Sequence, residues 1–315
     1  MIKIKPLKKG DTIGIISPAF CSPKEPSAYQ YMIDYLETKG YKVKLGKSFY
    51  SRDGFLAGSD EIRTNDINEM FQDKEVSAII CMRGGYGASR IVDKIDYEII
   101  KNNPKILCGY SDITVLCNAI YKLCDIPTWH GLIAAYLGDK DKDQRSIDDF
   151  WCALTKNQKG RILKNPGEKP LTLISGKAEG KLVGGNLSLL ATLCGSPYEV
   201  DFTDKIVFIE EVGEEPYQID RYLSCLRLRG SLDKAKGFVF GYFTSCNPSE
   251  SRKDTQSTFD IIKDYFMKLN KPMMYGFNSG HQDPFVNLPI GAKVLMDSDK
   301  GTIEIMEEIY EESSN

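Results

Sequence analysis

Short strand-like apolar runs alternate with longer amphipathic segments through the first part of the chain. The apolar runs lie at residues 12–17, 41–45, 76–82 and 105–109, and the polar-faced segments of helix length at 29–40, 60–73 and 112–124. Strands rich in Ile and Val that alternate with helices predict βαβ units, and therefore a parallel sheet covered on both faces. Sheets of this kind bind ligands in the loops at the carboxyl ends of their strands.

The pattern changes after residue 137. Residues 138–175 are charge-rich and contain Pro and Gly, so we interpret them as a connecting region with one helix near residues 146–154. Beyond it, strands are expected at 205–210 and 237–241, a helix at 216–228, and mostly β-rich sequence after residue 271. The prediction is a doubly wound parallel-sheet N-terminal domain (1–137), a connecting region (138–175) and a second, smaller α/β C-terminal domain (176–315).

Composition narrows the classes of function. Of the 315 residues, 42% are hydrophobic and 27% charged, as is typical of globular proteins. A net charge of −3 provides no positive field to hold nucleic acid or an anionic membrane, and no apolar run is long enough for a membrane span. The nine cysteines form no C-x-x-C pair and favour reduced thiols. We expect a cytoplasmic protein with a small or peptidic ligand.

Ser111 stands where an apolar strand turns sharply into a helix, with Gly109 relieving the crowding before it. This arrangement is typical of a nucleophile, because the N–H groups and dipole of a helix N-terminus stabilise a nearby oxyanion. The G-x-S-x-G elbow of α/β-hydrolases is not matched, since Ile113 occupies the position of its last Gly. The alternative is that Ser111 only caps the helix.

A nucleophilic serine needs a base, and the chain has two histidines, His130 and His281. His281 lies in a turn-rich stretch, whereas His130 follows the helix that Ser111 begins, so either can serve. The carboxylate that orients the base is expected at the end of the strand 205–210, where Glu210 is preferred over Glu211. An exposed acidic loop is the alternative for these glutamates.

A second turn between strand and helix contains Arg83-Gly-Gly-Tyr-Gly87. It is not a nucleotide fingerprint, because Arg90 replaces the third Gly and no G-K-[ST] follows. The turn is interpreted as an oxyanion hole, with a plain tight turn as the alternative. Zinc or calcium ligand spacing is absent from the sequence, so we predict no metal and no other cofactor.

Together these motifs resemble the LD-carboxypeptidase family of serine peptidases, whose other branch contains the microcin C immunity peptidases. The similar segments cover nearly the whole chain and lie at residues 17–18, 83–87, 109–114, 130–131, 184–190, 208–217, 220–221 and 280–284. The resemblance implies that Ser111 is the nucleophile, His281 the general base and Glu210 the residue that orients it. It also implies that the backbone amides of Gly85 and Asp112 form the oxyanion hole.

The resemblance further implies an activity. Family members release a C-terminal D-amino acid from an L-configured neighbour, as in the removal of D-Ala from murein tetrapeptide during cell-wall recycling. A muropeptide substrate and a homodimer are therefore expected.

Two alternatives remain. A microcin C immunity-type peptidase acts on aminoacyl-nucleotide or peptidyl-nucleotide conjugates with the same triad, but that branch tends to carry a longer insertion between Ser111 and Glu210. A non-catalytic protein that binds a peptide or a sugar in a cleft would explain the two domains, but not why Ser, Glu and His recur at strand ends.

Overall fold

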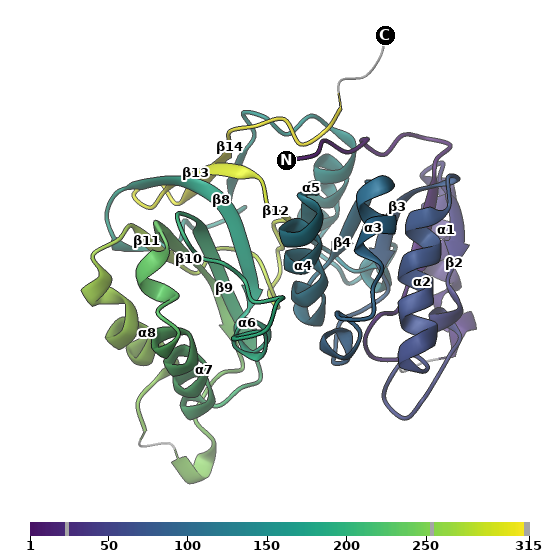
Figure 1. Ribbon diagram of the computed structural model, residues 1–315. Helices are drawn as coiled ribbons and strands as arrows, with labels where there is room; N and C mark the ends of the chain where they lie inside the picture. The colour runs from purple at the N-terminus through teal and green to yellow at the C-terminus, as the bar shows by residue number, and fades with distance from the viewer. Residues whose placement is uncertain (23–24, 253–254, 312–315) are drawn as a thin grey trace. The chain divides into compact units, whose positions relative to one another are not determined.

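The computed structural model describes residues 1–22, 25–252 and 255–311. Residues 312–315, the last of the predicted C-terminal domain, lie outside them. The chain divides into two compact units (Figure 1). The first comprises Met1–Gln158, Asn287–Gly291 and the described part of Glu308–Asn315, and the second comprises Lys159–Val286 and Ala292–Glu307. The fold is thus of the predicted class, with two α/β units.

The first unit is built on a six-stranded sheet with the order β12-β5-β4-β3-β1-β2. Its strands are β1 (Thr12–Ile16), β2 (Lys42–Leu45), β3 (Val76–Cys81), β4 (Ile106–Gly109), β5 (Thr128–His130) and β12 (Leu288–Ile290). Strands β1 to β5 are parallel, and only β12 runs antiparallel, beside β5 at the edge. Pro289 is tolerated in β12 because an edge strand has a side without a partner strand.

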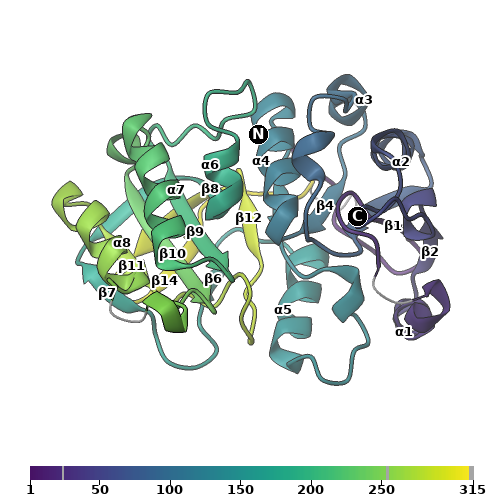
Figure 2. The same ribbon diagram turned by 90° about the horizontal axis from the view of Figure 1, so that it is seen from below.

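Helices cover both faces of this sheet, as the alternation of strands and helices predicts. Figure 2 shows α1 and α5 on one face and α2, α3 and α4 on the other. Their bounds are α1 (Gln30–Thr38), α2 (Asp60–Gln72), α3 (Tyr97–Asn102), α4 (Thr114–Cys124) and α5 (Gln144–Thr155). Short 3₁₀ helices lie between them at η1 (Pro26–Tyr29), η2 (Lys47–Phe49), η3 (Ala88–Arg90), η4 (Ser111–Ile113) and η5 (Ala134–Tyr136). Ser59, Asp96 and Asp143 cap α2, α3 and α5 with their side chains.

The second unit contains an eight-stranded mixed sheet with the order β6-β14-β13-β8-β9-β10-β11-β7. Its strands are β6 (Ile162–Lys164), β7 (Leu171–Ile174), β8 (Lys177–Asn186), β9 (Ile206–Val212), β10 (Gly237–Thr244), β11 (Met273–Tyr275), β13 (Lys293–Asp297) and β14 (Thr302–Ile305). The four central strands, β8 to β11, are parallel, and the flanking strands pair antiparallel.

The described part of this unit contains the helices α6 (Leu187–Thr192), α7 (Pro216–Leu228) and α8 (Thr258–Phe266), with 3₁₀ helices η6 (Leu232–Lys234), η7 (Glu250–Arg252) and η8 (Met267–Leu269). Helix α6 packs on β8 and β9, and α7 lies between α6 and α8 (Figure 1). Phe266 of α8 contacts the rings of Phe238 and Phe240 edge-on, with ring centroids 4.7 and 4.8 Å apart. These buried aromatic side chains fix α8 on β10.

All nine cysteines are free thiols. Cys81, Cys108 and Cys117 are buried in the first unit, where burial raises the pKa of Cys117 to about 12 and raises the pKa values of Cys81 and Cys108 well above the ordinary value of a thiol. Such thiols are not ionised at neutral pH and act as small apolar side chains. Within the described residues, no helix is both long enough and apolar enough to cross a bilayer.

Candidate active site

Three turns of the first unit follow the carboxyl ends of adjacent strands: residues 17–18 after β1, 83–87 after β3 and 110–111 after β4. The strand order reverses between β1 and β3, because β2 lies beyond β1 while β4 lies beyond β3. In doubly wound sheets this switch point is where ligands bind. The turns that carry Ser111 and Gly85 therefore lie at the edge of the sheet that the sequence predicts.

Ser111 is the first residue of η4, which leads directly into α4. Its backbone has φ +63°, a left-handed conformation that side-chain-bearing residues seldom adopt and that is common at functional positions. The side chain is half-buried. The sharp turn expected from Gly109-Tyr-Ser111 is therefore present where β4 passes into η4 and α4.

Gly84 allows the turn after β3 to approach this serine closely. A Cβ atom at Gly84 would lie 2.7 Å from Cβ and 3.0 Å from Oγ of Ser111. The next residue, Gly85, has φ +112° and lies against the ring of Phe20, which leaves no space for a Cβ atom. Gly84 and Ser111 thus lie against each other, and each is followed in sequence by a predicted oxyanion-hole residue, Gly85 and Asp112.

Two buried charged side chains connect these turns. The Asp112 carboxylate accepts a hydrogen bond from the backbone N–H of Ala88 at 2.7 Å, which links η4 to η3. Arg63 of α2 is fully buried and donates hydrogen bonds to the carbonyl oxygens of Pro18 and Gly87, at 2.7 and 2.8 Å. Sequence analysis missed Arg63, because an arginine within an amphipathic helix gives no sign that it is buried.

Burial raises the pKa of the Asp112 carboxyl group to about 7. The hydrogen bond from Ala88 and the positive charge of Arg63 act in the opposite direction without cancelling the effect. A carboxyl group with a raised pKa binds its proton more tightly in the folded protein than in the unfolded chain. Its contribution to stability is therefore fully present at low pH and is lost as the pH rises through about 7.

We expect the free energy of unfolding of the first unit to fall between pH 5 and pH 8 by about 2–3 kcal/mol more in the wild type than in Asp112→Asn. The amide cannot ionise, and its oxygen can still accept the bond from Ala88. Urea titrations followed by tryptophan fluorescence measure this difference, since both tryptophans, Trp129 and Trp151, belong to the first unit.

Asp125→Asn is the control for this prediction. The Asp125 side chain lies in the same unit but is 60% exposed. Asp125→Asn should therefore lose as much free energy of unfolding between pH 5 and pH 8 as the wild type does. Equal pH dependence in Asp112→Asn and the wild type would show that Asp112 does not titrate in this range.

In the second unit, His281 and Glu210 are hydrogen-bonded. Glu210 lies in β9, its side chain is fully buried, and its Oε2 is 2.7 Å from Nδ1 of His281. His281 follows β11 on a loop, and its carbonyl oxygen accepts a hydrogen bond from the Thr244 hydroxyl at 2.8 Å. The preceding residue, Gly280, has φ +100°, and a Cβ there would lie 2.5 Å from Oε2 of Glu210. Glycine at position 280 therefore permits the close approach of this loop to β9.

Glu211 has a different environment. Its carboxylate accepts hydrogen bonds from the side chain of Asn186 and from the backbone N–H groups of Ser188 and Val212, at 2.6, 2.8 and 2.9 Å. Burial, and then repulsion from Glu210, raises the pKa of Glu211 to about 7. Adjacent residues of a strand point to opposite faces, which explains why Glu210 and not its neighbour contacts the imidazole.

His130, the other histidine considered as a base, lies at the end of β5 and pairs in register with Gly109. Its side chain is 1% exposed and its ring lies edge-on to Tyr110, with centroids 5.9 Å apart. Ser111 and His130 thus belong to the first unit, whereas Glu210 and His281 belong to the second.

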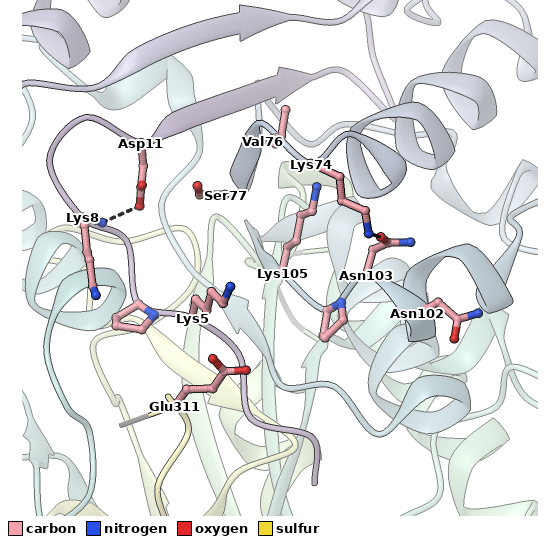
Figure 3. A pocket seen from close by; sticks show the side chains of 12 residues that line it. Lys5, Lys8, Asp11, Lys74, Val76, Ser77, Asn102, Asn103, Lys105 and Glu311 are labelled. Atoms are coloured by element: carbon pink, nitrogen blue, oxygen red, sulfur yellow. Dashed lines mark hydrogen bonds between the residues drawn. The ribbon is translucent and has the colours of Figure 1, made fainter. Parts of the chain in front are cut away.

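A cavity of about 650 Å³ lies at the opposite, amino edge of the first sheet (Figure 3). Lysines line it, and Lys105 extends toward the carboxyl end of α2, where its ammonium group donates hydrogen bonds to the carbonyl oxygens of Met70 and Asp73. Burial lowers the pKa of Lys105 to about 8. Cations near helix C-termini stabilise the helix dipole, so the burial of Lys105 has a structural explanation.

Among the described residues, no three His, Cys, Asp or Glu side chains gather as metal ligands do. The first unit thus contributes a serine at a strained turn with nearby backbone N–H groups, and the second unit contributes a histidine–carboxylate pair. These are the components of acyl-transfer chemistry.

Comparison with known proteins yields matches over both units. Residues 13–131 match the family model described as the LD-carboxypeptidase N-terminal domain, and residues 179–296 match that of the LD-carboxypeptidase C-terminal domain. The chain is 41% identical over 311 residues to a probable murein peptide carboxypeptidase of Bacillus subtilis, which covers 96% of this chain and 94% of that protein.

Two further relatives represent the two branches. A crystal structure of a muramoyltetrapeptide carboxypeptidase from Oxalobacter formigenes is 27% identical and superposes with a TM-score of 0.81, covering 93% of this chain and 97% of that one. The microcin C7 self-immunity protein MccF of Escherichia coli is 28% identical over 332 residues, covering 96% and 95% of the two chains.

Proposed function

Because this chain belongs to the LD-carboxypeptidase family, we propose that it hydrolyses an L,D-peptide bond and releases the C-terminal D-amino acid of a murein tetrapeptide. The names of the relatives from Bacillus subtilis and Oxalobacter formigenes support this substrate class. The observation that carries the proposal is the hydrogen bond between Glu210 and His281, because it prepares a histidine as a general base.

In the proposed mechanism, Ser111 is the nucleophile and His281 the base. The Glu210 side chain accepts a hydrogen bond from the Nδ1–H of the imidazole, so that Nε2 carries the lone pair that takes a proton. Ser111 Oγ forms a bond to the scissile carbonyl carbon while its proton passes to Nε2. The tetrahedral intermediate then expels the amine of the D-amino acid, which receives that proton from His281.

Water completes the reaction. It attacks the acyl carbon as His281 removes one of its protons. The second tetrahedral intermediate then expels Ser111 Oγ, which receives that proton from His281, and releases the shortened peptide with a new carboxyl group. The backbone N–H groups of Gly85 and Asp112 stabilise the oxyanion in both intermediates. This mechanism requires Nε2 of His281 and Oγ of Ser111 to come within about 2.6–3.2 Å of each other in the substrate complex.

The proposal also includes the compartment and the assembly. Nine free thiols suit a reducing cytoplasm, where murein tetrapeptides are recycled. As the family resemblance implies, the enzyme acts as a homodimer.

Mass spectrometry of the products from a panel of D-Ala-terminated muropeptides tests this function. We expect one product that is shorter by D-Ala alone, because an LD-carboxypeptidase cleaves only the last bond. A tetrapeptide that ends in L-Ala is the control and should remain intact. Cleavage at an internal bond, or equal cleavage of the L-Ala peptide, would contradict the proposed activity.

A second candidate is hydrolysis of an aminoacyl-nucleotide conjugate, which the similarity to the Escherichia coli self-immunity protein favours. The same triad would act on that substrate. Measuring kcat/KM for a murein tetrapeptide and for an aminoacyl sulfamoyl adenylate separates the two activities. We expect the tetrapeptide to be the better substrate, and a higher value for the adenylate would reverse this ranking.

A further inference from the structure

Arg83 lies directly before the glycines that approach Ser111. It follows β3 and precedes Gly84, the residue whose Cα position packs against the serine side chain. Its guanidinium is attached to the same turn as the proposed oxyanion hole, at the carboxyl edge of the sheet. From this position, the long side chain of Arg83 can contact a substrate group that lies a few bonds from the carbonyl carbon attacked by Ser111.

The guanidinium of Arg83 makes few contacts for a half-buried cation. It donates one hydrogen bond, from Nη1 to the carbonyl oxygen of Cys21 at 3.1 Å, and it lies over the ring of Phe20 at 5.9 Å from the ring centroid. Throughout residues 1–22, 25–252 and 255–311, it has no acidic side chain as a salt-bridge partner. An arginine has five N–H donors, so most of them remain available for a ligand.

Two nearby arginines of the same unit, Arg63 and Arg90, differ in this respect. Both form salt bridges with Asp60. Among the described residues, no carboxylate neutralises the charge of Arg83 as Asp60 neutralises theirs. Phe20 also underlies Gly85, and an aromatic ring beneath a planar guanidinium restricts its orientation without occupying its N–H groups.

We propose that Arg83 binds the terminal carboxylate of the substrate. The inference rests on the proposed carboxypeptidase activity, since an enzyme that removes a last residue must distinguish a free C-terminus from an internal peptide bond. A guanidinium matches a carboxylate with two parallel hydrogen bonds, and a half-buried position strengthens this interaction relative to bulk water. Arg83 is thereby the residue that confines cleavage to the end of the chain.

Paired substrates test this role. The murein tetrapeptide with a free D-Ala carboxylate is compared with the same peptide ending in D-Ala amide, which lacks the negative charge. We expect Arg83→Gln to lower kcat/KM for the free acid by about 100-fold and to change that for the amide by less than about 3-fold. Arg83→Lys should recover part of the loss, because an ammonium keeps the charge without the two-pronged geometry.

Arg52→Gln is the matched control. Arg52 is an exposed arginine that donates one hydrogen bond to the carbonyl oxygen of Ser22, the residue after the one that Arg83 contacts. Its replacement should leave the preference for acid over amide unchanged. Loss of activity on acid and amide by the same factor in Arg83→Gln would assign Arg83 a structural role and overturn the proposal.

A binding measurement separates this inference from the proposed activity. In a Ser111→Ala background, calorimetry gives the Kd of the acid and the amide, and we expect the acid to bind at least about 10-fold more tightly only when Arg83 is present. If the wild type cleaves neither peptide while this Arg83-dependent preference persists, the activity is wrong and the carboxylate site stands. If cleavage occurs but Arg83→Gln keeps the preference for the acid, the carboxylate site is wrong.

Discussion

Replacement of Ser111 by alanine is expected to lower kcat for D-Ala release by about 10⁴-fold to 10⁶-fold with little change in KM. The substitution removes the only oxygen that can form the acyl-enzyme in the proposed mechanism. The oxyanion donors and the substrate contacts remain, which explains why some rate enhancement over water should persist. Steady-state assays of purified variants measure the loss, and labelling with a fluorophosphonate should disappear with it.

Ser77→Ala is the matched control for this experiment. Ser77 is a half-buried serine in β3 of the same sheet, and it lines the cavity at the amino edge in Figure 3. Its removal should leave both turnover and labelling unchanged. Near-normal turnover in Ser111→Ala, in protein with the same unfolding transition as the wild type, would remove Ser111 from the mechanism.

Glu210→Gln is expected to lower kcat by about 10⁴-fold. An amide cannot support the positive charge that His281 acquires when it takes a proton. The amide can also present its NH₂ group to Nδ1, which would force the proton onto Nε2 and leave no lone pair for Ser111. The pH dependence of kcat checks this explanation, because a base with altered proton affinity shifts the acidic limb of the profile.

Glu211→Gln distinguishes the two adjacent carboxyl groups. Glu211 binds Asn186 and two backbone N–H groups, and its pKa of about 7 leaves it partly protonated at neutral pH. We expect its replacement to change kcat by less than about 10-fold. A larger loss of kcat in Glu211→Gln than in Glu210→Gln would show that Glu211, and not Glu210, orients His281.

Much of the first sheet could be predicted because its strands are buried on both faces. Continuous Ile-rich and Val-rich runs at β1, β3 and β4 are the expected sequence of such strands, and the intervening helices have one apolar face. Helix α7 begins and ends at the predicted residues, since Pro216 favours the first turn of a helix. Local chemistry of this kind is visible without any knowledge of tertiary contacts.

The candidate site could be predicted only in part. Strand ends followed by Gly-rich turns pointed to Ser111 and Gly85, and a strand-terminal glutamate pointed to Glu210. The positive φ of Ser111 and the burial of Arg63 arise from packing between segments far apart in sequence, so no local pattern reveals them. The same holds for Arg83, because only the folded chain reveals that it has no acidic partner among the residues the structure describes.

Strand β12 was also invisible to hydrophobic patterning, because a three-residue strand that contains Pro289 has no distinctive sequence. It pairs with β5, and Asn287 beside it accepts a hydrogen bond from the N–H of Leu132 and donates two to Asp149. These contacts join the last part of the chain to a sheet whose other strands are complete by residue 130.

This arrangement has a consequence for biosynthesis. A ribosome that has translated the first 158 residues has synthesised five strands of the sheet, but the sixth is made only after the whole of residues 159–286. Until then the β5 edge has unpaired backbone groups, and exposed strand edges promote aggregation. The nascent protein therefore passes through a long interval in which its first sheet is open, and fragments that end before residue 288 inherit that open edge permanently.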